Sequence, residues 1–353
     1  MRSVMKIGLV AAALLATAAN AALDLTKRNN MVLYWGQNAH GSYDNTTSKQ
    51  QQSLYTYCQD PNVDAISIGF LNSWNATDGG QPLVNFANSC TGYEKFPGTD
   101  LLWCPTIAAD IQACQLLGKT ILISIGGYSP TYSGFASPAA ADAFAYQIWN
   151  MFGKGWSYYR PFGSAIVDGF DLDIEVQPSQ YYEKFVYRLR KLFEADGSKK
   201  YYITAAPQCH NPDPQLDTAL RKANFDAVFV QFYNNPNCAA TAWTGKGGDQ
   251  SSNSVFNFGM WDSWVSSSAF NKNMKVLMAL PASNKIVISG YVSKAKASDI
   301  VADLARFKSF AGVAIWDASE VWVNTGYITQ VKSALNAVTA LGRRGTGFFR
   351  WYM

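Results

Sequence analysis

The sequence has very little histidine, with only His40 and His210 among 353 residues. A Ser-His-Asp triad or a metal site made of several histidines is therefore hard to build. Charged residues are also few, at 15%, whereas hydrophobic residues reach 48%, so the chain can bury a large core and is neither disordered nor of low complexity. The length fits one large domain or two medium ones. We expect chemistry based mainly on carboxylates, amides and phenols.

Long apolar runs are absent beyond the N-terminus, so we expect no membrane span in the mature protein. The N-terminus itself has a basic start, a run of 13 residues from Ile7 to Ala19 and the small-residue pattern Ala19-Asn20-Ala21. Such a run is shorter than the roughly 20 residues that span a bilayer. These features predict a signal peptide over residues 1–21, and hence a secreted, extracellular protein.

Secretion affects how the six cysteines are interpreted, because disulfides persist in oxidising compartments. An even number suggests three disulfides, although six cysteines allow about 15 connectivities. Our hypothesis pairs cysteines that flank one loop and joins the two that remain: Cys90 with Cys104, Cys209 with Cys238, and Cys58 with Cys114. Two Asn-x-Thr sequons, at Asn45 and Asn75, are candidate glycosylation sites.

Short apolar runs rich in β-branched or aromatic residues alternate with segments of helical spacing. Eight such runs lie at residues 31–35, 64–70, 119–127, 164–175, 200–207, 225–233, 274–281 and 311–319, with helices expected at 138–152, 179–195, 294–309 and 325–340. This rhythm predicts a single (β/α)8 TIM barrel over residues 22–341, followed by a disordered Gly- and Arg-rich tail over 342–353. Neither a Gly-x-Gly-x-x-Gly nor a Walker A pattern follows the first run, which weakens a nucleotide-binding alternative.

Residues 168–175, Asp-Gly-Phe-Asp-Leu-Asp-Ile-Glu, combine an apolar strand pattern with acidic residues. Because strand side chains alternate, Asp171, Asp173 and Glu175 share one face, which points into the barrel. Like charges this close keep at least one proton, which raises a pKa. A solvated edge strand or a calcium site is the alternative, but calcium prefers ligands from a flexible loop. A protonated carboxylic acid is what glycoside hydrolysis requires, and Glu175, at the carboxyl end, is the natural donor.

The chain resembles glycoside hydrolase family 18, specifically the class III chitinases of fungi and plants. The resemblance covers residues 30–340 and includes the family signature Asp-Gly-x-Asp-x-Asp-x-Glu, matched in full by residues 168–175. Further matches are Tyr34-Trp35-Gly36-Gln37-Asn38, Ser124-Ile125-Gly126-Gly127, Ala205-Ala206-Pro207-Gln208-Cys209, Gln231-Phe232-Tyr233-Asn234-Asn235 and Trp316.

This resemblance implies hydrolysis of β-1,4-linked N-acetylglucosamine with retention, in which the substrate's own acetamido oxygen is the nucleophile and an oxazolinium-like intermediate forms. Glu175 is then the acid and later the base, while Asp173 orients the acetamido N–H and stabilises the developing positive charge. Asp171 can share a proton with Asp173. Tyr233 is expected to hold the acetamido carbonyl in position for attack.

The remaining site residues also follow from the resemblance. Tyr34, Phe70, Gln231 and Asn234 are expected to line the pocket, and Gly127 to let the backbone approach the substrate. Trp316 is expected to form the platform under the reacting sugar, since an indole stacks on the apolar face of a sugar ring. For Gln231, Tyr233 and Trp316 the alternative is that they simply fill the barrel. No metal and no cofactor are expected.

The expected partner is chitin or chito-oligosaccharides, bound by a monomer. Removing Arg2 and Lys6 changes the 29 basic and 25 acidic residues to 27 and 25, and setting aside Arg343, Arg344 and Arg350 leaves 24 and 25. A nearly neutral barrel suits a neutral polysaccharide and not a nucleic acid. Only about 30 residues separate the last two runs, so no added β-rich insertion deepens the groove, which favours endo-cleavage.

Two other functions compete with this interpretation. One is a non-catalytic carbohydrate-binding protein or enzyme inhibitor on the same scaffold, because fold does not determine function. The other is an enzyme of the same family that acts on peptidoglycan or on N-glycan cores, which contain the same acetamido group.

Overall fold

The computed structural model describes residues 23–345 except 75–79, 91, 93, 129–133, 177 and 178. The predicted signal peptide, the sequon at Asn75 and residues 346–353 therefore lie outside the described residues. The other sequon residue, Asn45, is exposed in the loop between two short 3₁₀ helices, η1 (Ala39–Ser42) and η2 (Thr47–Lys49).

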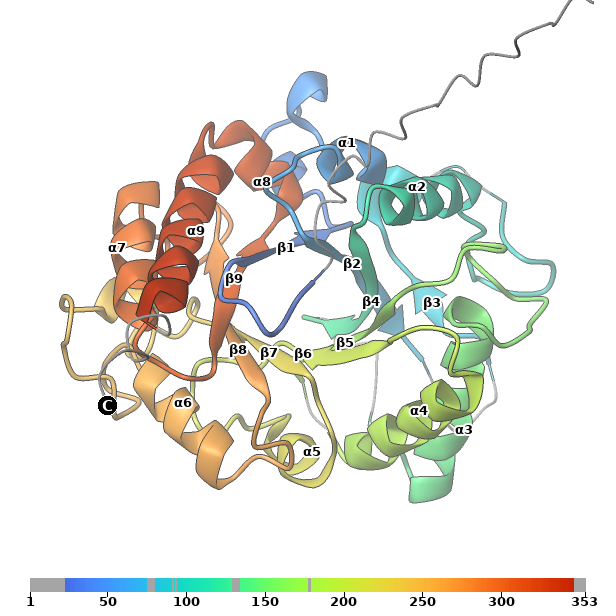
Figure 1. Cartoon of the computed structure of the whole chain (residues 1–353). Coiled ribbons are helices and arrows are strands. Elements are labelled where there is room, and N and C mark those ends of the chain that lie inside the picture. The colour runs from blue at the N-terminus through green and yellow to red at the C-terminus, as the bar shows by residue number, and fades with distance from the viewer. Residues whose placement is uncertain are drawn as a thin grey trace, which may run out of the picture.

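Eight parallel strands close into a barrel, as predicted (Figure 1). They are β1 (Asn30–Trp35), β2 (Ala65–Ser73), β4 (Thr120–Gly127), β5 (Gly169–Ile174), β6 (Tyr202–Ala205), β7 (Ala227–Gln231), β8 (Lys275–Pro281) and β9 (Phe310–Trp316). The closure is made by β1, which pairs in parallel with both β2 and β9. A short strand, β3 (Leu83–Val84), adds to β2 in the antiparallel direction.

Helices surround the barrel, as Figure 1 shows along its axis. They are α1 (Leu54–Cys58), α2 (Pro105–Leu116), α3 (Pro138–Phe152), α4 (Tyr182–Asp196), α5 (Asp217–Lys222), α6 (Phe258–Ser267), α7 (Lys294–Leu304), α8 (Ala318–Val323) and α9 (Tyr327–Gly345), with the 3₁₀ helices η3 (Ala87–Cys90) and η4 (Ala240–Ala242) in loops. None of the helices in the described part of the chain is long and apolar enough to cross a membrane.

Local sequence explains where these elements form and end. The strands are apolar almost throughout because they are buried on both faces. Helix α3 begins at Pro138 after Ser137, whose side chain accepts the N–H of Ala140 as an N-cap. Helix α4 buries one stripe of its surface, including Phe185 and Leu189, and stops at Gly197 in the left-handed conformation.

Some predicted boundaries differ from the structure. The strand expected over residues 164–175 covers only Gly169–Ile174, because the chain before it forms a turn over residues 161–164, in which the N–H of Ala165 donates to the carbonyl of Phe162 at 2.9 Å. The helix expected over 294–309 ends at Leu304. Helix α9 continues to Gly345, past residue 341, where the sequence predicts the catalytic domain to end.

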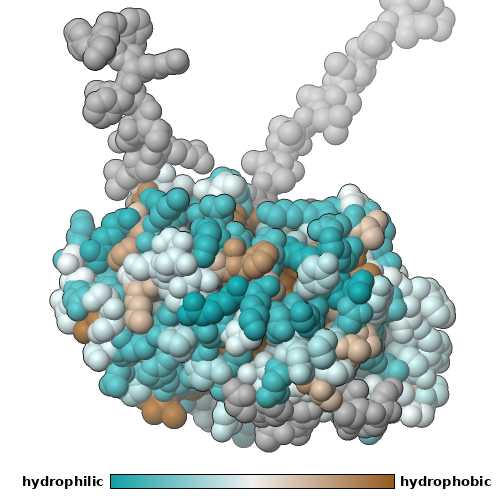
Figure 2. All heavy atoms as spheres, turned by 90° about the horizontal axis from the view of Figure 1, so that it is seen from below, coloured by the Kyte–Doolittle hydropathy of each residue, from teal (hydrophilic) through white to brown (hydrophobic). Residues whose placement is uncertain are grey.

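The apolar core has two parts. The larger part lies between the strands and the helices, and the smaller part fills the inside of the barrel, where Tyr34, Leu122 and Phe229 are buried. Burial of each such side chain contributes about 1.5–3 kcal/mol. The outer face seen in Figure 2 is mostly hydrophilic with scattered apolar spots. The barrel is therefore a packed scaffold whose chemistry must lie at a strand end.

The three predicted disulfides are confirmed. Cys58–Cys114 joins α1 to α2, Cys90–Cys104 closes the long connection between β2 and α2, and Cys209–Cys238 ties the loops that follow β6 and β7. The Cα atoms of the pairs are 5.4, 5.6 and 5.8 Å apart, which is the usual range for a disulfide. Two of the bridges thus fix loops at the carboxyl ends of strands.

Candidate active site

The acidic residues of β5 project into the barrel, as the alternation of strand side chains predicts. Asp171 and Asp173 are 0% and 4% exposed, and Glu175 follows the last residue of the strand. The two aspartates are level with Ser124 and Gly126 of β4, so they stand one above the other along the barrel axis. The carboxyl end of a barrel strand is where catalytic groups occur in this fold.

Asp171, the deepest of the three, is surrounded by hydroxyl groups from four other strands. Tyr34 Oη donates to Oδ2 at 2.8 Å, Ser124 Oγ to Oδ2 at 2.7 Å and Thr204 Oγ1 to Oδ1 at 2.6 Å, with Ser67 Oγ further away at 3.3 Å. Burial raises the pKa of Asp171, and these hydrogen bonds oppose that increase. The site therefore contains one buried carboxyl whose charged form is well solvated by protein hydroxyls.

Asp173 and Glu175 form a coupled pair. A hydrogen bond joins the two carboxyls, and Gln231 Nε2 donates to Asp173 Oδ1 at 2.9 Å and to Glu175 Oε1 at 3.4 Å. Burial and the nearby charge of Glu175 raise the pKa of Asp173 well above its usual range, and burial raises the pKa of Glu175. A hydrogen bond between two carboxyls requires a proton, so the pair retains one. The negative charge of Asp171 also raises the pKa of Asp173 by repulsion.

The pair lies at the wall of a cavity of about 490 Å³. This volume falls within the range of small-molecule sites. Its lining combines acids, amides, phenols, aliphatic side chains and two other aromatic rings: Phe70, Tyr128, Asp173, Glu175, Gln208, Gln231, Tyr233, Asn234, Ile286, Ile288 and Trp316. Seven of the ten predicted site residues thus line one cavity. The other three do not line it: Tyr34 binds Asp171 inside the barrel, and Gly127 lies against Phe70.

Aromatic rings form one side of this cavity. Phe70 and Trp316 are stacked with centroids 5.9 Å apart at 25°, and Tyr34 also lies 5.9 Å from Trp316. Gly127 has a positive φ of 76°, and a Cβ there would lie 2.8 Å from Cδ2 of Phe70. The glycine thus makes room for the Phe70 ring, a contact that the sequence did not predict; the expected approach of its backbone to the substrate stays a prediction.

Asn234 acts on the neighbouring loop. Its Oδ1 accepts the N–H of Ile288 at 2.9 Å, and its own N–H donates to the carbonyl of Ser289 at 3.0 Å. These bonds hold the β8–α7 loop, from which Ile286 and Ile288 line the cavity. Ile288 is 88% exposed, and Tyr128, the first residue after β4, is 86% exposed, so the rim is open.

Sequence reasoning missed five residues at or near the site. Tyr128, Gln208, Ile286 and Ile288 line the cavity. Asp213 lies behind Gln208, whose N–H donates to it at 2.9 Å, and burial raises the pKa of Asp213 to about 6. Gln208 belongs to Ala205-Ala206-Pro207-Gln208-Cys209, one of the matches to the family, which was a usable signal, whereas the others lie on loops whose sequences show no pattern.

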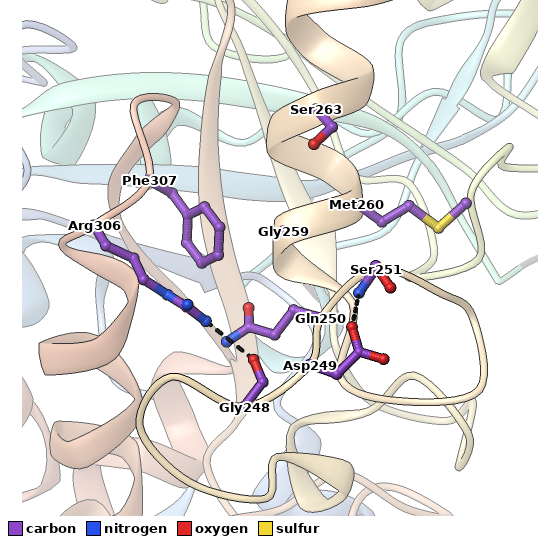
Figure 3. A pocket seen from close by; sticks show the side chains of 9 residues that line it. All are labelled: Gly248, Asp249, Gln250, Ser251, Gly259, Met260, Ser263, Arg306 and Phe307. Atoms are coloured by element: carbon purple, nitrogen blue, oxygen red, sulfur yellow. Dashed lines mark hydrogen bonds between the residues drawn. The ribbon is translucent and has the colours of Figure 1, made fainter.

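A second hollow of about 390 Å³ lies elsewhere, between the loop that precedes α6 and the end of α7 (Figure 3). Arg306 donates to the carbonyl of Gly248 at 3.2 Å there, and Asp249 is the one acid among the lining residues. The described residues contain no group of three or more His, Cys, Asp or Glu that could hold a metal ion. The cavity at the end of β5 is therefore the better candidate for chemistry.

A paired set of buried acids at the carboxyl end of β5, facing stacked aromatic rings, defines a glycosidase-type site on a TIM barrel. The family model "Glycosyl hydrolases family 18" matches residues 30–295, so the chain belongs to this family.

Individual proteins agree with this membership. "Chitinase 2" of Rhizopus oligosporus is 41% identical over 332 residues, which cover 94% of this chain and 57% of that protein. This chain thus spans little more than half the length of that relative. Among solved structures, the ICChI chitinase of Ipomoea carnea is 27% identical with a TM-score of 0.70, covering 86% of this chain and 99% of the other. The xylanase and α-amylase inhibitor protein XAIP-II of Scadoxus multiflorus is 28% identical with a TM-score of 0.67, over 86% and 98%.

Proposed function

We propose that this protein is a secreted, monomeric, endo-acting chitinase that cleaves β-1,4-linked N-acetylglucosamine polymers with retention of configuration. The observation that carries this proposal is the proton-sharing pair of Asp173 and Glu175 in a cavity lined by Phe70 and Trp316. Membership in family 18 and a chitinase among the relatives support it. Three disulfides fit an oxidising compartment.

Glu175 has the properties of the general acid. It is near the cavity, its pKa is raised by burial, and it shares a proton with Asp173. When that proton is on Glu175, it can be donated to the glycosidic oxygen as the bond breaks. Asp173 is left negatively charged beside the reacting sugar, so the same proton movement that arms the acid creates a stabilising charge.

The position of Asp173 argues against a nucleophile supplied by the enzyme. In retaining enzymes with two independent carboxylates, the groups are about 5–5.5 Å apart and lie on opposite sides of the scissile bond. Here the two carboxyls are hydrogen bonded to each other, and both accept a hydrogen bond from Gln231 Nε2. The nucleophile must then come from the substrate, and the acetamido oxygen of N-acetylglucosamine fits this role.

Asp173 and Tyr233 are suited to hold that acetamido group. Both line the cavity, and Asp173 as an anion can accept the acetamido N–H and stabilise the positive charge of the oxazolinium-like intermediate. The Tyr233 phenol can donate to the acetamido carbonyl, because burial and the neighbouring acids raise its pKa and keep it protonated. Attack on the anomeric carbon then expels the leaving sugar, and Glu175 as base activates the incoming water.

Substrate contacts follow from the shape of the cavity. Trp316 and Phe70 offer ring surfaces for the apolar face of the reacting sugar. The connection from β8 to β9 consists of a loop, α7 and a short link, so no added strand walls the groove over residues 282–309. Together with the exposed rim at Tyr128 and Ile288, this supports cleavage within a long chain.

The proposal is tested by incubating the purified protein and its Glu175→Gln variant with a hexamer of N-acetylglucosamine, with peptidoglycan as a parallel substrate. We expect the wild type to release internal products as the β-anomer, detected by NMR before mutarotation. The variant should bind the hexamer and lose activity by at least 100-fold, which removal of a key catalytic group commonly causes.

Each other outcome points to a specific alternative. Binding without hydrolysis by the wild type would indicate a non-catalytic binding protein or inhibitor. Faster turnover of peptidoglycan than of the hexamer would show that peptidoglycan, and not chitin, is the substrate. Release of only terminal disaccharide would overturn endo-cleavage, and an α-anomer as first product would overturn retention.

A further inference from the structure

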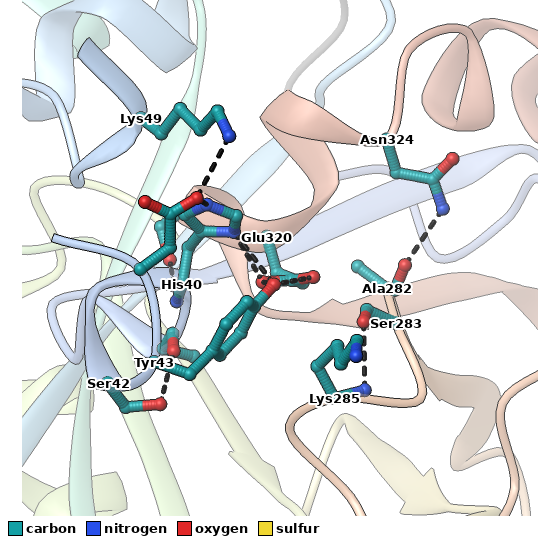
Figure 4. Close-up of polar contacts among 12 residues, drawn as sticks. His40, Ser42, Tyr43, Lys49, Ala282, Ser283, Lys285, Glu320 and Asn324 are labelled. Atoms are coloured by element: carbon teal, nitrogen blue, oxygen red, sulfur yellow. Dashed lines mark hydrogen bonds and ion pairs between the residues drawn. The ribbon is translucent and has the colours of Figure 1, made fainter. Parts of the chain in front are cut away.

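A second polar cluster stands beside the candidate active site and takes no part in the mechanism above. The Tyr43 hydroxyl donates to both oxygens of Glu320, at 2.7 and 2.8 Å, and Nδ1 of His40 lies 2.9 Å from Glu320 Oε2 (Figure 4). Glu320 is only 3% exposed, whereas Tyr43 is 45% exposed. The cluster therefore has a buried carboxyl at its inner end and a half-exposed aromatic residue at its outer end.

This cluster is fixed to the segment that carries Trp316. Asp317, the next residue, accepts the N–H of Ala39 at 3.0 Å through its Oδ2, and Ser319 Oγ accepts the N–H of His40 at 3.1 Å. The loop after β1 and the start of α8 are thus bonded together directly beside the aromatic side of the cavity.

Tyr43 also lies close to the loop that forms another side of the cavity. Ser283, at the beginning of the β8–α7 loop, is near the Tyr43 hydroxyl, and Ile286 and Ile288 of the same loop line the cavity. Figure 4 shows Tyr43 between the loop after β1 and this β8–α7 loop. The ring therefore lies at the same end of the barrel as Glu175, outside the cavity and separated from it by the β8–α7 loop.

We propose that Tyr43 forms an outer sugar-binding subsite, which stacks on one N-acetylglucosamine unit of a long chain beyond those held in the cavity. This inference rests on the proposed function, which supplies the chain. The hydroxyl is already bound to Glu320, so the ring loses little conformational freedom when a sugar binds. Packing of its edge against His40, with centroids 4.9 Å apart, further restricts it. A restrained, half-exposed ring is suited to the apolar face of a sugar.

The test compares chain lengths. Tyr43→Ala should lower kcat/KM on the hexamer about tenfold, the size expected for loss of one aromatic stacking contact, and should have a much smaller effect on a fluorogenic chitobioside. Tyr187→Ala is the matched control, since Tyr187 is also exposed but lies on α4. Tyr43→Phe keeps the ring and removes its bond to Glu320, so its loss on the hexamer should lie between the wild type and Tyr43→Ala.

Hexamer binding by Glu175→Gln and by Glu175→Gln/Tyr43→Ala, measured by calorimetry, provides a second readout that does not need turnover. We expect about tenfold weaker binding in the double variant. An equal loss of kcat/KM on both substrates would indicate a structural role for Tyr43 and overturn the subsite, as would no loss on the hexamer. If the wild type hydrolyses nothing but binds the hexamer, the proposed function fails while this comparison of affinities still decides about Tyr43.

Discussion

The contact between Gly127 and Phe70 gives a prediction whose size can be worked out from the structure. In Gly127→Ala the new Cβ lies 2.8 Å from Cδ2 of Phe70, at a residue with φ of 76°. The left-handed backbone costs an alanine about 1–2 kcal/mol, and forcing a methyl into a packed contact costs about 1–3 kcal/mol more. We therefore expect the free energy of unfolding to fall by about 2–5 kcal/mol in urea denaturation.

A matched glycine separates the two contributions. Gly98 has φ of 75°, and a Cβ added there would have no atom within 4 Å, so Gly98→Ala should lose only the backbone contribution, about 1–2 kcal/mol. In a Phe70→Ala background the obstructing ring is gone, and Gly127→Ala should then cost the same as Gly98→Ala. Equal losses for the two glycine variants in the wild-type background would refute the steric explanation.

Function provides an independent check of the same contact. A displaced Phe70 ring disturbs its stacking on Trp316, and such an aromatic contact is worth about 0.5–1.5 kcal/mol. We expect kcat/KM on the hexamer to fall roughly 2- to 10-fold in Gly127→Ala and to be unaffected in Gly98→Ala. Unaltered kinetics in Gly127→Ala would show that the position of Phe70 is not important for the site.

Three further predictions concern pH and covalent structure. Because Glu175 must carry a proton to act as acid, kcat/KM should fall as pH rises through the raised pKa of the pair with Asp173, and a rate that increases steadily with pH would contradict this role. Burial raises the pKa of Asp213 from 3.8 to about 6, so between these pH values the folded state binds more protons than the unfolded state. The free energy of unfolding should therefore fall by about 3 kcal/mol from this group as pH rises from 4 to above 6. Asp213→Asn should flatten this dependence of the free energy of unfolding on pH, measured by urea denaturation. An equal slope in that variant would exclude Asp213 as its source. Replacing Cys58 and Cys114 by serine opens a loop with a sequence separation of 56, which should lower the free energy of unfolding by about 4 kcal/mol; an unchanged urea midpoint would contradict the loop-entropy estimate.

The sequence was sufficient for the scaffold because its signals are local and repeated. Fully buried parallel strands must be apolar throughout, so each strand is visible as an apolar run. The alternation within residues 168–175 places Asp171, Asp173 and Glu175 on one face whatever the rest of the chain does. What alternation does not decide is which carboxyls share a hydrogen bond, because that depends on rotamers and on Gln231 from β7.

Loop residues were harder to predict because their positions depend on distant backbone contacts. Ile286 and Ile288 line the cavity from a loop whose backbone is bound by Asn234, which belongs to a different part of the chain. No periodicity marks such residues, and an exposed isoleucine in a loop is ordinary in a sequence. Gly127 shows the same limit, since its neighbour across the sheet, Phe70, belongs to another strand and could not be assigned from spacing.

The hydroxyl groups around Asp171 could have been predicted in part from the sequence. Strand pairing puts Ser124, Asp171 and Thr204 at one level on three adjacent strands, and it pairs Tyr34 with Ser67 on two more. In each case a hydroxyl interrupts an apolar strand, where it needs a partner because burying a polar group without one is costly. A single hydroxyl in the middle of a buried strand is therefore a signal that another polar group faces it. In a barrel with an acidic strand, such hydroxyls face the deepest acid and solvate it, and their hydrogen bonds oppose the increase in the pKa of Asp171 that burial causes.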